Sequence, residues 1–383
     1  MKNEAFSNKI PCSEDFSLSN DHGGNVSEQY QYQDEMVFKA VGKLTHYLKP
    51  VVLAMTTSSG KSATVTKLLN EILTDGKRAV FLGSNLTTLA EQYCKSLSTS
   101  DPLGPKFTFS TLGEPQKTKL KIGLPQQLVN NPDNFEFLIL DEAQWLWMRK
   151  GDPNSLISKA LKASGYPKII LMTGTPALFN KNKDQYEILH LSYEKIPNEP
   201  IPVFSKIVVD VLKLECREDL STCISKFLCS VRKNGDDISK FVVVARNIEE
   251  AISVKDILEN QMGVGTIIST SRHDKDSSNL ERFKSENYQA CVTVSRVIAG
   301  WSYTELTCVL DLRSSFNITN TFQLMSRLFR VSQKNRKVEK VYFRVADNSQ
   351  YNKTIKFLHL VVALLDDNIY KGFDGTNLVL KGA

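Results

Sequence analysis

The sequence predicts an α/β protein of two successive domains, each a mostly parallel sheet with helices on both faces. Three observations favour this fold class. Short apolar runs alternate with segments of helical periodicity, which is typical of parallel strands that are buried on both faces. The alternation stops at a proline-rich break near residue 200 and then resumes. The length of 383 residues suits two domains of ordinary size.

The first domain is expected over residues 30–196, after a polar and flexible tail at residues 1–29. An apolar run at 51–55 leads through a Ser/Gly turn into a helical pattern at 63–74, which indicates strand, loop and helix. Further strands are predicted at 78–82, 135–140 and 168–172.

Three prolines within a short stretch predict an extended linker at 197–204. The second domain is expected over 205–346, and a closing helix with a tail over 347–383, the helix reaching residue 372. Strands are predicted at 240–245, 265–269, 290–294, 308–312 and 341–345, and helices at 249–260, 277–284 and 317–329. No sequence repeat is visible, although the similar patterns suggest two structurally related domains.

Composition narrows the class of protein. A hydrophobic content of 41% and a charged content of 23% describe a soluble globular chain. No apolar run reaches the roughly 18 residues that a membrane span needs, and the N-terminus lacks the apolar core of a signal peptide. The sequence therefore predicts a protein that is not secreted and acts in the cytoplasm, at a nucleoid or at a viral replication site.

The charge distribution is compatible with nucleic-acid binding, whereas the cysteines and histidines give no indication of disulfides or of a metal site. Residues 201–383 carry 26 Lys and Arg against 21 Asp and Glu, a net charge of +5 out of +6 for the chain. Part of this charge lies in a cluster at Lys334, Arg336, Lys337 and Lys340. Nucleic acid would bind such a surface, but charge alone favours a solvated loop. The seven cysteines are scattered without a CxxC pair, which disfavours disulfides and a zinc site, and the isolated His190 and His273 suggest no metal.

Gly60, Lys61 and Ser62 stand where the first strand becomes a helix. Backbone N–H groups of such a loop point at phosphate oxygens, with help from the helix N-terminus. The lysine would reach the β- and γ-phosphates of a nucleotide, and the serine hydroxyl would bind Mg²⁺. The strict phosphate-loop pattern requires glycine where Met55 stands, so this segment alone does not decide between a phosphate site and a chance match.

Asp141 and Glu142 directly follow the predicted strand at 135–140. Carboxylates at the C-terminal end of a parallel strand lie at the sheet edge where ligands bind. Asp141 can hold Mg²⁺, and Glu142 can orient and deprotonate a water molecule. The alternative is an ordinary acidic turn, which the presence of Lys61 makes less attractive.

Gln323, Arg327 and Arg330 fall within the predicted helix at 317–329 and its end. The two arginines are three residues apart and would share one face, while Leu324 and Leu328 would pack another. Arginines aimed at a γ-phosphate stabilise the transition state of phosphoryl transfer. The alternative is a surface pair without a role.

Taken together, these motifs resemble those of superfamily 2 helicases and translocases, whose fold is two tandem RecA-like domains. Residues 55–62 match motif I, including Thr57, Ser58 and Ser59, although Ser58 replaces the usual glycine. Residues 141–144 resemble motif II, and Gln323 with both arginines resembles motif VI, in which Ser326 replaces glycine.

Further segments fit the same resemblance less closely. Thr173 and Thr175 lie in a TGTP sequence like motif III, and Tyr32-Gln33 resembles the element whose glutamine contacts adenine. Residues 89–92, with Ala90 and Gln92, resemble motif Ia, which touches the nucleic-acid backbone. Residues 242–247 resemble motif IV. Residues 293–302 resemble motif V, with Thr293 and Trp301 facing nucleic acid and Gly300 at the nucleotide; Ser302 stands where the family has aspartate.

The resemblance implies an ATP-dependent DNA helicase or translocase that requires ATP and Mg²⁺. Lys61, Asp141, Glu142, Gln323, Arg327 and Arg330 would carry catalysis, and Gln144, Thr173 and Thr175 would couple hydrolysis to movement. The TGTP and YQ forms favour the DNA-acting branch with phage repair helicases and restriction motors, hence DNA replication or repair.

Several alternatives stay open. They are an RNA helicase, a duplex translocase that does not separate strands, and a degenerate nucleic-acid-binding module. Trp145 and Trp147 are expected to pack against the sheet rather than to stack on bases. No added specificity domain is recognised, so modest sequence specificity or recruitment by a protein partner is expected.

Overall fold

The computed structural model describes segments of both predicted domains. These are residues 31–46, 49–55, 59–73, 80–83, 90, 93–94, 97, 109–111, 119–147, 149–191, 207–215, 219–233, 240–298, 301, 303–329, 340–363 and 378–380. Several predicted features lie outside them: the N-terminal tail, the proline-rich linker, and Lys334, Arg336 and Lys337 of the basic cluster.

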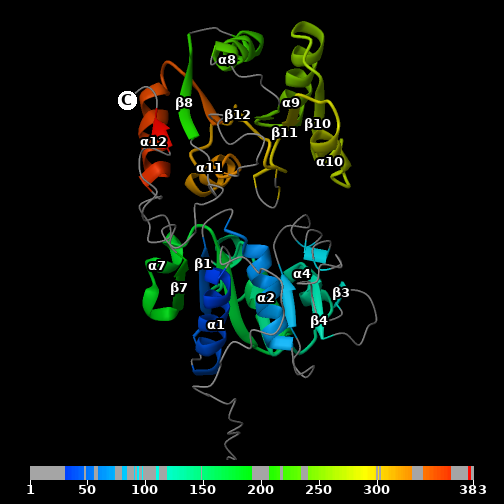
Figure 1. Cartoon of the computed structure of the whole chain (residues 1–383), viewed down its shortest axis with the longest axis vertical. Helices are drawn as coiled ribbons and strands as arrows, with labels where there is room; N and C mark the ends of the chain where they lie inside the picture. The colour runs from blue at the N-terminus through cyan, green and yellow to red at the C-terminus, as the bar shows by residue number, and fades with distance from the viewer. Residues whose placement is uncertain are drawn as a thin grey trace, which may run out of the picture.

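The first domain is built on a seven-stranded sheet in which all hydrogen-bonded neighbours run parallel. Figure 1 shows it as the lower of two lobes. In spatial order its strands are β3 (Phe109–Thr111), β4 (Leu120–Gly123), β2 (Val80–Gly83), β5 (Phe137–Leu140), β6 (Lys168–Thr173), β1 (Val51–Met55) and β7 (Glu187–Leu191).

Helices cover both faces of this sheet because its strands bury alternate side chains in two separate clusters. Phe137 and Ile139 of β5 join the cluster that includes the first two helices, whereas Leu138 and Leu140 join a second cluster. The helical segments of this domain are α1 (Gln31–His46), α2 (Lys61–Leu73), α4 (Pro125–Asn130), α5 (Gln144–Trp147), α6 (Leu156–Ala163), α7 (Ala177–Asn180) and the 3₁₀ turn η2 (Lys183–Gln185).

The second domain repeats the same arrangement with another parallel seven-stranded sheet. Numbered from one within each domain, both sheets have the strand order 3-4-2-5-6-1-7. The strands in spatial order are β10 (Thr266–Ser269), β11 (Ala290–Thr293), β9 (Phe241–Val244), β12 (Cys308–Asp311), β13 (Lys340–Asp347), β8 (Ile207–Leu214) and β14 (Leu378–Leu380).

The helices of the second domain again lie on both faces of the sheet. Val242 and Val244 of β9 belong to one buried cluster and Phe241 and Val243 to the other. The helical segments are α8 (Leu220–Lys233), α9 (Ile248–Asp256) with the π-helical turn η4 (Ile257–Gln261), α10 (Ser278–Ser285), α11 (Ile318–Met325) and α12 (Tyr351–Ala363). None of the helices in the described segments is both long enough and apolar enough to span a bilayer.

The predicted fold class is confirmed, with corrections to individual elements. All nine predicted strands form. Five others escape prediction because they are short, as β3, β4 and β14 are, or carry polar residues, as β7 and β8 do. Strand β14 pairs with β8, so part of the expected C-terminal tail completes the second sheet. The helix expected at 317–329 ends at Met325.

Lys340 does not belong to an exposed basic cluster, because it is fully buried at the start of β13. Its ammonium group donates to the backbone carbonyl of Thr304 at 3.0 Å. The aliphatic part of a lysine packs well inside a protein when its charged end finds acceptors. Lys340 is therefore a structural residue and adds nothing to a basic surface.

Candidate active site

Ser59 and Gly60 are the described residues between β1 and α2, and the backbone at Gly60 suits close approach to a phosphate. Gly60 adopts a φ of 81°, a left-handed conformation that side-chain-bearing residues rarely adopt. A Cβ atom at this position would lie 2.4 Å from Nε2 of Gln33. Helix α2 begins at the next residue, with Lys61 half-buried and Ser62 exposed in its first turn, so its free N–H groups open towards the turn.

Helix α1 supports this turn from one side. The Tyr32 hydroxyl donates to the Ser59 carbonyl at 2.9 Å, and Nε2 of Gln33 approaches the same oxygen at 3.4 Å. Gln33 is buried, with 3% of its surface exposed. The Tyr-Gln pair therefore fixes the loop backbone; the predicted adenine contact of Gln33 remains a prediction.

Asp141 and Glu142 lie at the C-terminal end of β5. Asp141 is 4% exposed, and its two oxygens accept from the Tyr93 hydroxyl and the Glu142 backbone N–H, each at 2.8 Å. Burial, and then the neighbouring Glu142 carboxylate, raise the pKa of Asp141 to about 6, while Lys61 and the Tyr93 hydrogen bond oppose the rise. Glu142 has a φ of 50°, which costs free energy in a residue other than glycine.

A chain of hydrogen bonds connects Glu142 to the TGTP segment. The Thr175 backbone N–H donates to the Thr173 hydroxyl at 3.0 Å, and this hydroxyl donates to Oε1 of Gln144 at 2.8 Å. The Gln144 amide then donates to Oε2 of Glu142 at 2.7 Å. The three residues predicted to couple hydrolysis to movement thus lie in one continuous network with the predicted base.

The second domain joins this network through Gln323. Its amide nitrogen donates to the same Oε2 of Glu142 at 2.9 Å. Gln323 lies on α11, whose first turn is capped by the Asn317 side chain, and it is 5% exposed. Its Oε1 is buried and has no hydrogen-bond partner within the described part of the chain. The predicted catalytic glutamate is therefore a direct hydrogen-bonding link between the two domains.

Arg327 occupies a different setting from the one expected. It lies in the turn after α11, is 5% exposed, and donates to the carbonyls of Trp301 at 2.6 Å and Ile298 at 2.7 Å. Burial lowers its pKa to about 10, and the charge of Glu142 offsets part of this effect. Its Nε is buried without a partner among the residues that the structure describes. The expected helical face shared with Arg330 does not form, because the helix ends first; Arg330 itself lies outside the described residues.

The expected nucleic-acid contacts at Thr293 and Trp301 also need correction. Thr293 is fully buried at the end of β11, and Trp301 is 3% exposed. The Trp301 ring packs between Phe283 and Tyr303, with centroids 6.3 and 5.9 Å away. A base cannot stack on a ring that is covered on this scale, so Trp301 serves the core of the domain.

The remaining predicted residues have mixed outcomes. Ala90 is half-buried and packs against the core. Trp147 is 3% exposed and donates to the Tyr186 hydroxyl at 3.1 Å, which confirms its expected packing role. Thr57, Ser58, Gln92 and Gly300 lie outside the described residues.

Sequence reasoning missed Tyr93, although this residue contacts one of the predicted site residues. Its hydroxyl donates to Oδ2 of Asp141 at 2.8 Å. A usable signal was present, because Ala90, Tyr93, Cys94 and Leu97 repeat at helical spacing and all pack on the core.

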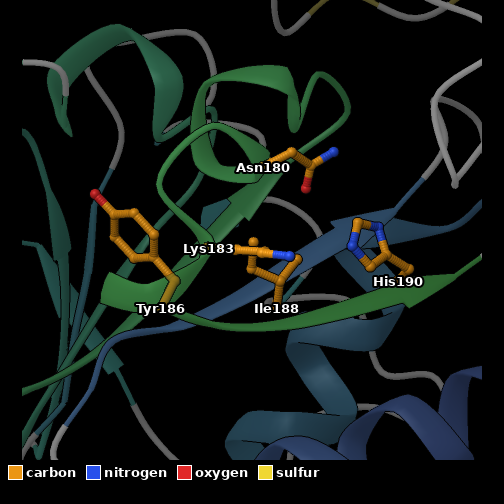
Figure 2. Close-up of a pocket in the computed structure, with 5 residues that line it drawn as sticks. All are labelled: Asn180, Lys183, Tyr186, Ile188 and His190. Carbon is orange, nitrogen blue, oxygen red and sulfur yellow. The ribbon is translucent and has the colours of Figure 1, made fainter.

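A pocket of about 390 Å³ lies away from this site, beside the edge strand β7. Figure 2 shows Ile188 and His190 projecting from β7 towards it, with Asn180, Lys183 and Tyr186 around them. None of the predicted site residues lines it. The candidate site is therefore assigned from the convergence of side chains rather than from the size of a cavity.

The residues fit a nucleotide with Mg²⁺. The left-handed Gly60 lets the backbone approach a phosphate closely, and Lys61 adds a positive charge. A serine hydroxyl and one carboxylate supply oxygen ligands, and protein magnesium sites commonly combine one or two such ligands with substrate phosphates. The orphaned Nε of Arg327, a hydrogen-bond donor, suits an anionic neighbour.

Solved structures with the same two-domain fold include restriction enzymes and an RNA-bound protein. A fragment assigned as the HsdR subunit of a type I restriction enzyme from Vibrio vulnificus aligns with a TM-score of 0.59 at 16% identity, covering 84% of this chain and 64% of that one. Saccharomyces cerevisiae Dbp5 bound to RNA and ADP BeF3 aligns at 0.61 and 11% identity, covering 93% and 94%. The ATP-dependent type ISP restriction-modification enzyme LlaBIII bound to DNA aligns at 0.61 and 12% identity, covering 93% and 31%.

These likenesses establish the fold. The chain has the fold of two tandem RecA-like domains, as predicted. It spans less than two thirds of the HsdR fragment and about a third of LlaBIII. No protein-family model and no curated protein sequence matches the chain.

Proposed function

We propose that this chain is a nucleic-acid-dependent ATPase that couples ATP hydrolysis between its two domains to movement on DNA. The observation that carries the proposal is the hydrogen bond from Gln323 of the second domain to Glu142 of the first. It brings motifs separated by 181 positions to one point at the domain junction. A site assembled from two domains can report their relative position to a bound nucleotide.

Each residue has a role that follows from its position. The turn at Gly60 and the charge of Lys61 would bind the β- and γ-phosphates. Ser62 and Asp141 would hold Mg²⁺, which supplies electrostatic stabilisation of the transferring phosphoryl group. Glu142 would orient and deprotonate the attacking water.

The second domain would complete the site. Gln323 already contacts the base, and Arg327 with Arg330 would stabilise the charge that develops on the γ-phosphate. In the present arrangement the Arg327 guanidinium is bound to two backbone carbonyls. Its assignment to the phosphates therefore requires closure of the domains around the nucleotide.

The network from Glu142 through Gln144 to Thr173 would carry coupling. Loss of the γ-phosphate changes what Glu142 contacts, and the two amide donors on its Oε2 come from different domains. A change in the hydrogen bonds of this oxygen would therefore affect both the TGTP segment and α11. Opening and closing of two domains that each grip a nucleic-acid backbone would yield steps along a strand.

DNA is favoured over RNA as the substrate. The TGTP and YQ forms favour the DNA-acting branch, and one of the structural relatives is a restriction-modification enzyme bound to DNA. The relative bound to RNA keeps an RNA helicase as the second candidate.

The test is steady-state ATP hydrolysis with single-stranded DNA, duplex DNA, forked DNA or RNA, each compared with no nucleic acid. We expect DNA to stimulate hydrolysis and Lys61→Ala to abolish it. Lys67→Ala is the matched control because Lys67 lies on the same helix and pairs with Asp34 on the surface. Full DNA-stimulated hydrolysis by Lys61→Ala would overturn the assignment, and stimulation by RNA alone would favour the second candidate.

A further inference from the structure

Tyr93 contacts Asp141, one of the two side chains that are proposed to hold Mg²⁺. The tyrosine is 3% exposed. Its hydroxyl donates to Oδ2 of Asp141 at 2.8 Å. No predicted motif includes this residue, and it comes from neither the phosphate loop nor the strand that carries Asp141.

Both oxygens of the Asp141 carboxyl group accept a hydrogen bond. Oδ2 accepts from the Tyr93 hydroxyl, and Oδ1 accepts from the Glu142 backbone N–H, each at 2.8 Å. The Tyr93 hydroxyl therefore helps to fix the orientation of this carboxyl group, while each oxygen keeps a further lone pair for a cation.

The phenol is held firmly from the opposite side. Ala90, Tyr93, Cys94 and Leu97 are helical residues at spacings of three and four, and they present one face to the buried core of the first domain. Tyr93 and Leu97 are each only 3% exposed. The position of the Tyr93 hydroxyl is therefore fixed. An outer-shell partner must be fixed in this way if it is to orient a metal ligand.

We infer that Tyr93 is a positioning residue that orients Asp141 for binding of the Mg²⁺–nucleotide complex. The inference rests on the proposed function, because it concerns the same metal site. It adds a residue to that site and predicts how the site fails without it. Because Tyr93 follows directly on the motif Ia-like segment at 89–92, it also joins a proposed nucleic-acid contact to the proposed metal site.

Tyr93→Phe tests the inference, because it keeps the ring in the core and removes only the hydroxyl. The measurement is binding of fluorescent N-methylanthraniloyl-ADP to the full chain as MgCl₂ is titrated, together with binding in EDTA. The matched control is Tyr186→Phe, which removes the hydroxyl of another buried tyrosine of the same domain, one that accepts a hydrogen bond from Trp147. Loss of an outer-shell partner typically lowers metal affinity by about 10- to 100-fold.

We expect Tyr93→Phe to need at least about 10-fold more Mg²⁺ for half-maximal binding. Binding in EDTA should match the wild type, and Tyr186→Phe should match it in both conditions. An unchanged or lower Mg²⁺ requirement would overturn the inference while leaving the proposed function intact, and a lower one would show that the phenol competes with the metal. Weakened binding in EDTA would overturn it too, by assigning Tyr93 a purely structural role. A wild-type chain without Mg²⁺-dependent nucleotide binding would overturn both proposals.

Discussion

Replacing Asp141 by asparagine should stabilise the nucleotide-free protein at neutral pH while it abolishes ATP hydrolysis. The carboxyl is 4% exposed and its pKa rises from 3.8 to about 6, chiefly because burial disfavours the charged form. Each pKa unit corresponds to about 1.4 kcal/mol, so ionised Asp141 lowers the free energy of unfolding by about 3 kcal/mol. Asparagine removes the charge; its Oδ1 can still accept from the Glu142 N–H, and its Nδ2 can donate to the Tyr93 hydroxyl, which then acts as the acceptor.

The pH dependence follows from the direction of the shift. Below about pH 4 the carboxyl is protonated in the folded and unfolded chains alike, and the charge has no effect on stability. As the pH rises through about 6 the folded protein must carry the buried charge, and the stability present at low pH is lost. The advantage of the asparagine variant should therefore develop between about pH 4 and 6.

Calorimetric melting in EDTA measures this effect. At pH 7.5 we expect a gain of about 1–3 kcal/mol, or at least about 2 °C in melting temperature for a domain of this size, after allowing for one weakened hydrogen bond. At pH 4 the two proteins should melt together. Asp184→Asn, at an exposed aspartate of the same domain, is the control. A variant that is less stable than wild type at pH 7.5, or a difference independent of pH, would refute the reasoning.

Three further substitutions test the loop, the domain junction and the coupling network. Gly60→Ala should lower the free energy of unfolding by about 1–2 kcal/mol because of the left-handed backbone at this position, and it should weaken nucleotide binding, measured by fluorescence titration. The control Gly42→Ala, which has open space around its Cβ, should leave binding unchanged. Equal effects of the two substitutions would contradict the steric argument. Gln323→Glu places a second carboxylate beside Glu142 and should separate the domains, which small-angle scattering would detect as a larger radius of gyration; an unchanged radius counts against the observed junction. Thr173→Val removes one buried hydrogen bond and should lower DNA stimulation of hydrolysis by roughly 10-fold with the basal rate nearly unchanged, and an equal fall in both rates would argue against coupling.

The sequence predicts the positions of strand ends well, because the physics there is local. Short apolar runs such as β1 and β5 are buried on both faces, and a glycine or an acidic pair directly after them marks the C-terminal edge of a parallel sheet. Lys61 and Glu142 could therefore be assigned to one sheet edge from the sequence alone. The cross-domain contact at Gln323 followed from the motif order and the resemblance, and not from periodicity.

What the sequence could not supply depends on packing between distant segments. Helical periodicity continues past Met325, so nothing local indicates that the helix ends there and that Arg327 turns towards Trp301. Burial of Trp301 depends on Phe283 of α10 as well as on the nearby Tyr303, and the sequence does not indicate the contact with α10. Tyr93 lies 48 positions from Asp141, and a lone tyrosine in a helical pattern is ordinarily a core residue.

The identical strand order of the two sheets has a consequence for nucleotide stoichiometry. In the first domain the chain leaves its first strand through Ser59, Gly60 and Lys61. At the equivalent place after β8 the sequence reads Glu-Cys-Arg-Glu-Asp, with neither glycine nor lysine. The two domains are therefore not equivalent, because only the first has a glycine and a lysine directly after its first strand. Under the proposed function, this place in the first domain would bind the phosphates of one ATP, and the second domain would add Gln323 and Arg327 to the same site.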